Sequence, residues 1–314
     1  MRHRPLRLAL WLAACSLLLP CLPAVDTSQA EARRQEKPAS TLLFVVSRNA
    51  EGATLAPVLT IDQGSYKQPV AGDSDAEEIS QFASRYYRKG QKYRVLFGGG
   101  EAGSLTVKES TKDSECFRTG ANVTLQTPAG LNTNVMALAT NSDSLGRAKG
   151  SRRAPTANER AAALSLARDA YKQKGVPTPL LSSLTTVNLT ATDLDGDGQE
   201  ELIGSFVVKK TKGGQARYVL FLLAEPQGKG YRAGLTQYGH YTEKDIMSGA
   251  NIDAIGASGI YTERLVDQLD LDGDAAAEVI TLTTGFEGVS YVVYRKQQGK
   301  WQKIYDFGNY RCAF

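Results

Sequence analysis

Two stretches of the sequence carry the same spacing of acidic residues, and this repeat constrains the fold more than any other feature. DLDGDGQEELI begins at Asp193, and DLDGDAAAEVI begins at Asp270, 77 positions later. In both stretches, carboxylates stand at positions 1, 3, 5 and 9. Carboxylates held this close repel one another unless a cation lies among them. The hard cation Ca²⁺ takes six to eight oxygen ligands.

We therefore predict two calcium loops, in which the main-chain carbonyl at position 7 is a further oxygen donor. The alternative is a pair of Asp- and Gly-rich turns that water alone solvates. The predicted ligands are Asp193, Asp195, Asp197, Glu201 and the carbonyl of Gln199 in the first loop, and Asp270, Asp272, Asp274, Glu278 and the carbonyl of Ala276 in the second.

Neither stretch is an EF-hand. An EF-hand loop needs a bidentate glutamate at position 12 and a helix on each side. Position 12 holds Gly204 in one stretch and Thr281 in the other. The flanks of the first loop, TTVNLTAT and ELIGSFVV, are rich in β-branched residues, which favour strands. Both loops are therefore predicted to join neighbouring strands.

The similarity of the two regions extends beyond the loops. Each copy contains an acidic loop followed by three apparent strands separated by turns, and the copies span about residues 185–245 and 260–314. Repeats of this length with several strands each are typical of propeller blades or of duplicated small sheets. Residues 185–314 are therefore predicted to form a duplicated calcium-binding β unit.

The first half of the chain is also predicted to be rich in strands. Residues 41–140 contain short β-branched and aromatic runs separated by Gly, Asn, Asp and Pro. One helix is expected within this region, at about residues 75–89, because Ser74 and Glu77 have capping-box spacing. The predicted fold class is mainly β, or α+β overall, with two propeller-blade-like antiparallel repeats after this β-rich region.

A basic segment, residues 141–155, separates the two halves and is predicted to be a solvated linker. It precedes a second predicted helix at residues 156–175. Thr156 and Glu159 have capping-box spacing at its start, and a glycine ends it.

The acidic stretches resemble the calcium-binding loops of the FG-GAP repeat, which occurs in integrin α subunits and in related bacterial secreted proteins. The signature of that family is Asp-x-Asp/Asn-x-Asp-Gly-x-x-Asp/Glu, followed by an apolar strand. The first stretch matches it throughout, whereas the second has Ala275 where glycine is usual. The resemblance covers about residues 185–314. It implies propeller-type blades, bound calcium and a binding role outside the cell.

The N-terminus has the pattern of a secretory leader. Residues 1–24 contain three arginines and then an apolar run that ends in small residues, and residues 25–40 are a polar linker. LAAC, ending at Cys15, also resembles a bacterial lipobox, and cleavage there would leave a lipid-anchored protein instead of a secreted one. No other stretch is long and apolar enough to span a membrane.

Cysteine usage agrees with export. Removal of the leader leaves Cys116 and Cys312, and an oxidising compartment would join them in a disulfide. The alternative is two separate buried thiols.

Composition excludes several functions. Beyond the leader, 34 Lys+Arg face 33 Asp+Glu, a balance that gives no reason to expect nucleic-acid binding. His240 is the only histidine beyond the leader, which argues against a Ser-His-Asp triad and against multi-histidine metal sites.

We expect an exported binding or adhesion module, with structural calcium and with an extracellular protein or a glycan as its ligand. Two alternatives stay open. One is a structural component of the cell envelope. The other is a polysaccharide hydrolase that uses a pair of carboxylates. Its candidate acids are Glu200, Glu225, Glu243, Glu263 and Glu287.

Overall fold

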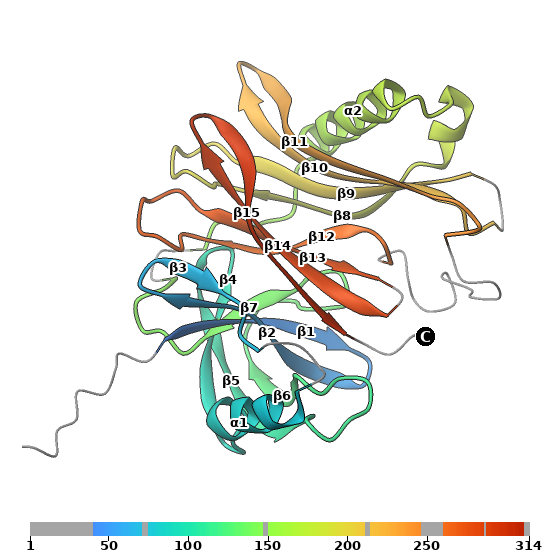
Figure 1. Cartoon of the computed structure of the whole chain (residues 1–314). Helices are drawn as coiled ribbons and strands as arrows, with labels where there is room; N and C mark the ends of the chain where they lie inside the picture. The colour runs from blue at the N-terminus through green and yellow to red at the C-terminus, as the bar shows by residue number, and fades with distance from the viewer. Residues whose placement is uncertain are drawn as a thin grey trace, which may run out of the picture. The chain divides into compact units, whose positions relative to one another are not determined.

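The computed structural model describes residues 40–70, 75–146, 150–210, 214–245, 260–285 and 287–310. The predicted signal peptide, the 25–39 part of the polar linker, Cys15 and Cys312 lie outside these residues. The fold is mainly β, as predicted, and consists of a barrel and two further sheets (Figure 1). None of the helices in the described ranges combines the length and the apolar character needed to cross a membrane.

The N-terminal β-rich region forms a six-stranded antiparallel barrel. Its sheet contains β1 (Thr41–Asn49), β2 (Gly52–Asp62), β3 (Ser65–Lys67), β4 (Lys92–Phe97), β5 (Gly100–Ser110), β6 (Ala121–Gln126) and β7 (Ala137–Thr140). The ring runs β1–β7–β4–β5–β6–β2 and closes because β2 also pairs with β1, while β3 extends from β2. Strand β1 is buried over five consecutive residues, so both of its faces are covered.

Helix α1 (Ala76–Tyr86) interrupts the barrel strands and buries Ile79, Phe82 and Ala83. Its N-cap is Asp75, whose carboxylate accepts a hydrogen bond from the Glu78 N–H at 2.9 Å. The capping box expected one position earlier is therefore wrong, because the Asp75 side chain already binds the third N–H of the helix.

The duplicated region folds as two four-stranded antiparallel sheets. The first contains β8 (Thr185–Thr192), β9 (Glu201–Lys209), β10 (Arg217–Gln227) and β11 (Gly230–Tyr241); the second contains β12 (Glu263–Leu269), β13 (Glu278–Thr284), β14 (Gly288–Gln297) and β15 (Lys300–Tyr310). In both sheets each strand pairs with the next one along the chain. In both, the acidic loop joins the first strand to the second, so the duplication in sequence is also a duplication in topology.

The second sheet lies between the first sheet and the barrel. Leu265 and Val279 pack with Ile203 of the first sheet, whereas their neighbours Val266 and Ile280 pack with the barrel core. This division follows from the period of two along a strand, which sends successive side chains to opposite faces. Helix α2 (Ala157–Gln173) and the 3₁₀ helix η2 (Thr178–Ser183) cover the other face of the first sheet (Figure 1).

The basic segment at 141–155 is not the solvated linker that its composition predicts. The Arg152 side chain is only 5% exposed. Its Nη1 donates to the carbonyls of Met136 and Val266, at 3.2 and 2.8 Å. The backbone of Arg153 pairs with that of Ala191 in β8. Burial of Nη1 is tolerated because main-chain carbonyls accept its hydrogen bonds in place of water, and the carboxylate of Asp267 balances the charge.

The predicted Cys116–Cys312 disulfide stays a prediction, because Cys312 lies outside the described residues. One contact supports it. Asn309, near the end of β15, donates a hydrogen bond from Nδ2 to the hydroxyl of Thr119. The end of the second sheet therefore lies beside the barrel segment that carries Cys116.

Candidate metal-binding loops

The loop between β8 and β9 folds around Asp193. The Asp193 carboxylate accepts hydrogen bonds from the N–H of Gly196 at 2.8 Å and from the N–H of Gly198 at 3.0 Å. Both glycines have φ in the left-handed region, at +74° and +83°, which glycine adopts without strain. This turn brings together carboxylate oxygens of Asp193, Asp195 and Asp197, all within 4.8 Å of one another.

The loop between β12 and β13 repeats this backbone. Asp270 accepts hydrogen bonds from the N–H of Gly273 at 2.7 Å and from the N–H of Ala275 at 3.0 Å. Ala275 takes the left-handed conformation of its glycine counterpart, with φ of +72°. Its departure from the family signature therefore leaves the hydrogen-bonding scheme unchanged. Here the carboxylate oxygens that lie within 4.8 Å of one another belong to Asp270, Asp272 and Glu278.

The aspartates at position 5 hold the second half of each loop. Asp197 accepts from the Gln199 N–H at 2.7 Å, and Asp274 accepts from the Ala276 N–H at 2.9 Å. Asp197 belongs to the first carboxylate cluster, but Asp274 does not belong to the second. The carbonyls of Gln199 and Ala276 stay predicted ligands.

The glutamates at position 9 fasten the start of each loop to the following strand. Glu201 accepts from the Leu194 N–H at 2.9 Å, and Glu278 accepts from the Leu271 N–H at 2.8 Å. Both glutamates are buried. Burial raises the pKa of Glu201 to about 7, and it raises the pKa of Glu278 as well. Glu278 is part of its carboxylate cluster, whereas Glu201 is not.

The two loops differ in the cation that the protein itself supplies. In the second loop, Arg295 of β14 contacts Glu278 through Nε at 2.5 Å and Asp272 through Nη2 at 2.9 Å. For the three clustered aspartates of the first loop, the nearest such contact among the described residues is Lys296 with Asp195, at 3.9 Å. Sequence reasoning missed Arg295 because it lies on the next hairpin. The pairing of β13 with β14 brings it beside Glu278.

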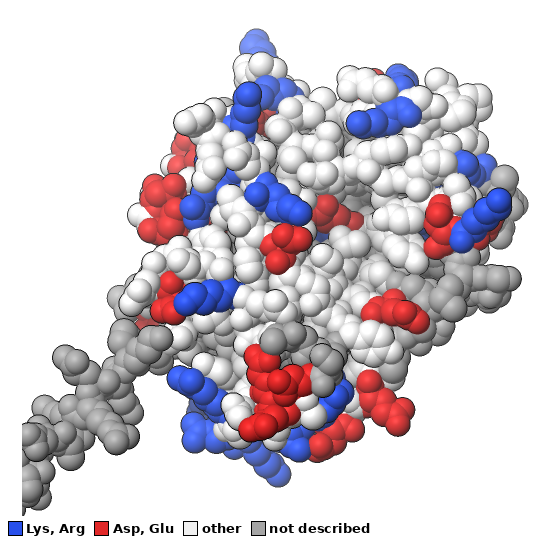
Figure 2. All heavy atoms as spheres, in the orientation of Figure 1, with Lys and Arg blue, Asp and Glu red and all other residues white. Residues whose placement is uncertain are grey.

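The donor set fits a hard divalent cation. All the clustered side-chain donors are carboxylate oxygens, and each such oxygen has two lone pairs, so one N–H bond leaves one for a metal. The three aspartates of the first cluster are partly or fully exposed, so an ion can reach them. Figure 2 shows acidic side chains at the edge of the molecule where, in Figure 1, the β8–β9 and β12–β13 loops lie.

The candidate acids for a hydrolase mostly have other partners. Glu225 is buried, accepts from the Trp301 indole N–H at 2.9 Å and pairs with Lys296 at 3.0 Å. Exposed Glu287 has no such contact among the described residues. The remaining contacts are Glu200 with Arg153, Glu243 with the N–H groups of Gln215 and Ala216, and Glu263 with the Thr281 hydroxyl.

Comparison with known proteins identifies no relative: no protein-family model, curated protein or solved structure matches the chain. The FG-GAP resemblance therefore rests on the two acidic loops alone.

Proposed function

We propose that this chain is an exported calcium-binding β-repeat protein, in which calcium orders two loops of a binding or adhesion module. The observation that carries the proposal is the repetition of one loop geometry. Two loops 77 residues apart share the hydrogen bonds around their first aspartate, and each gathers three carboxylates. A turn solvated by water alone would not require carboxylates at the same four positions, 1, 3, 5 and 9, of both loops.

The topology supports an FG-GAP-type interpretation of the repeats. Each repeat is a four-stranded meander, as a propeller blade is, and each carries its acidic loop between the first and second strands. Such a loop would bind calcium weakly, with Kd of about 10⁻⁴–10⁻³ M, as extracellular modules do. We assign the ion a structural role, because it would offset the repulsion between carboxylates at the end of a hairpin.

The two loops should not bind equally well. The guanidinium of Arg295 already contacts two carboxylates of the second cluster, so an ion there must displace it. Among the residues that the structure describes, the cation nearest the first cluster is the ammonium of Lys296, 3.9 Å from Asp195. The first loop is therefore the stronger site, and Arg295→Met should strengthen the second.

A calcium titration by calorimetry and thermal melting tests this proposal. With calcium at ten times Kd, one site adds about 1.4 kcal/mol to the free energy of unfolding, so the melting temperature should rise with calcium and fall with a chelator. Asp195→Asn should remove most of the response, while Arg295→Met should make the weaker binding event of the second loop tighter. Asp113→Asn, at an acid 87% exposed on the barrel, is the control. A melting temperature that changes neither with added calcium nor with added chelator would refute the proposal.

The hydrolase alternative has no structural support. It requires two carboxylates facing a cleft, and four of the five candidate glutamates have other partners. A structural component of the cell envelope would differ from a binding or adhesion module only in the partner that it contacts. A screen of the calcium-loaded protein against glycans and extracellular proteins separates the two.

A further inference from the structure

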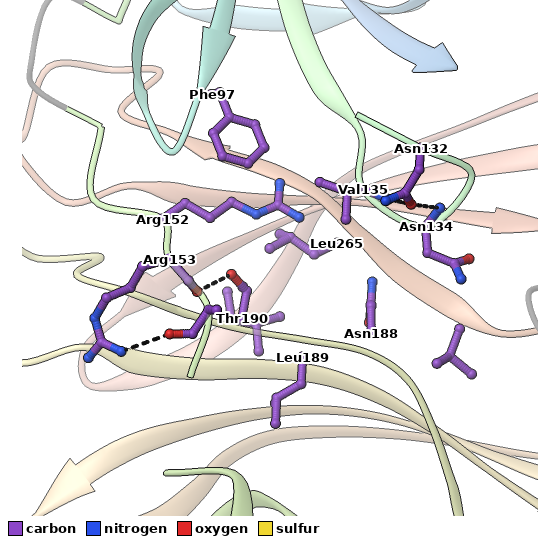
Figure 3. Close-up of a pocket in the computed structure, with 13 residues that line it drawn as sticks. Phe97, Asn132, Asn134, Val135, Arg152, Arg153, Asn188, Leu189, Thr190 and Leu265 are labelled. Atoms are coloured by element: carbon purple, nitrogen blue, oxygen red, sulfur yellow. Dashed lines mark hydrogen bonds between the residues drawn. The ribbon is translucent and has the colours of Figure 1, made fainter. Parts of the chain in front are cut away.

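A pocket of about 520 Å³ lies where the barrel, the basic segment and both C-terminal sheets meet (Figure 3). This volume falls within the range of small-molecule sites, roughly 300–1,000 Å³. The apolar residues of the lining come from strands of both sheets: Val187, Leu189, Ile203 and Leu265. Ile203 and Leu265 pack together between the two sheets, whereas the side chain of Leu189 packs on the α2 side of the first sheet. None of the acidic-loop carboxylates lines the pocket, so a ligand could bind there whether or not the loops hold calcium.

Arg152 reaches into this pocket from the basic segment (Figure 3). Its side chain is only 5% exposed, and the Phe97 ring lies 4.7 Å from its guanidinium carbon and covers one face. The hydrogen bonds of the guanidinium to described residues all come from Nη1. The edge formed by Nε and Nη2 therefore has two donors without a partner among those residues. Such an edge matches the two oxygens of a carboxylate.

The other charges near the pocket do not compete for a ligand. Arg153 also lines it, but its guanidinium is turned away toward Glu159 and Glu200, at 2.7 and 2.9 Å (Figure 3). Asp267 lies behind Arg152 and contacts Nη1 at 3.4 Å. None of the described lining residues is an aspartate or a glutamate.

We propose that this pocket binds a small molecule with one carboxylate and an apolar body. The carboxylate would accept two parallel hydrogen bonds from Nε and Nη2 of Arg152. The apolar body would lie along Ile203 and Leu265. An amine is excluded by the fixed positive charge, and a neutral amide presents only one acceptor oxygen to the two donors.

Three probes of one shape test the proposal by calorimetry in buffer without carboxylates: 4-phenylbutyrate, 4-phenylbutanamide and 4-phenylbutylamine. The wild-type protein should bind 4-phenylbutyrate at least tenfold more tightly than the amide, and the amine should not bind. The ¹⁵Nε resonance of Arg152 should shift on addition of 4-phenylbutyrate. Equal binding of all three probes, or binding of none, overturns the proposal.

Two substitutions then test which arginine is responsible. Arg152→Met should abolish the preference for the carboxylate, and Arg153→Met should preserve it. Loss of the preference in Arg153→Met alone would overturn the assignment. Arg94→Met, at a barrel arginine outside the pocket, is the control for general effects of removing a guanidinium. If Arg152→Met does not fold, the probe series on the wild-type protein still tests the preference for a carboxylate, and the ¹⁵Nε resonance still tests the contact with Arg152.

Discussion

At the scale of single residues, the two acidic loops show how one backbone can tolerate different side chains. Gly198 and Ala275 occupy equivalent positions, both donate their N–H to the first aspartate of the loop, and both have positive φ. Only glycine adopts this conformation freely, since the Cβ of an L-residue crowds the following carbonyl. The second loop therefore keeps its geometry with a strained residue.

This strain can be measured by exchanging the two residues. Ala275→Gly should raise the free energy of unfolding by roughly 0.5–1 kcal/mol, because relief of strain exceeds the added freedom of the unfolded chain. Gly198→Ala should lower it by a similar amount, since a Cβ at Gly198 would meet no atom within 4 Å and only backbone strain remains. Urea unfolding in excess chelator measures both. Changes of the same sign in the two variants would contradict this account.

At the scale of elements, local signals in the sequence located the helices and strands well. The capping box predicted at Thr156 and Glu159 is present at the start of α2, and the strands beside both loops lie where β-branched runs predict them. The burial of Arg152 could not be predicted, because the carbonyls that accept its hydrogen bonds come from distant segments, at Met136 and Val266. For the same reason, neither the pocket nor the pairing of Arg295 with the second loop was predicted.

The N-terminus of α2 should make stability depend on acid pH. Hydrogen bonds from Arg153 lower the pKa of Glu159 to about 2, from an ordinary value of 4.5. Because the folded pKa is the lower one, the stabilisation is complete above about pH 4.5 and is lost as the pH falls toward 2. Solvent screens the pair, so we expect a contribution of about 1 kcal/mol.

Glu159→Gln isolates this contribution, because glutamine can keep the capping box but loses the charge. The variant should be less stable than the wild type at pH 6, and the difference should vanish near pH 2, as measured by urea unfolding at several pH values. Glu77→Gln in the first turn of α1 is the matched control, since its carboxylate accepts from the Gln81 amide instead of an arginine. A constant difference between Glu159→Gln and wild type at all pH values would show that the pair with Arg153 contributes nothing.

At the scale of the whole molecule, long-range contacts hold the barrel together and join it to the sheets. Within the barrel, strand pairs such as Leu43 with Thr140 lie 97 residues apart and carry no local signal in the sequence. The β4–β5 turn of the barrel then meets β12: the Gly98 N–H donates to both carboxylate oxygens of Asp267, at 3.0 and 2.8 Å. Asp267 is fully buried and also pairs with Arg152.

Asp267 should therefore stabilise the described domain as one cooperative unit. Asp267→Ala leaves the guanidinium of Arg152 buried without its carboxylate, and loss of one partner from a buried pair typically costs about 3–5 kcal/mol. We expect this loss in the free energy of unfolding at pH 8, since burial raises the pKa of Asp267 to about 7 and the carboxylate must be ionised for the comparison.

Asp306→Ala, on an exposed side chain of the same sheet, is the control and should change the free energy of unfolding by less than about 0.5 kcal/mol. If the folding of the barrel and of the sheets depends on this contact, Asp267→Ala should unfold at a lower denaturant concentration than the wild type, and fluorescence and circular dichroism should report the same transition. A loss below about 1 kcal/mol in Asp267→Ala would mean that apolar packing between the barrel and the second sheet holds the two together without the buried pair.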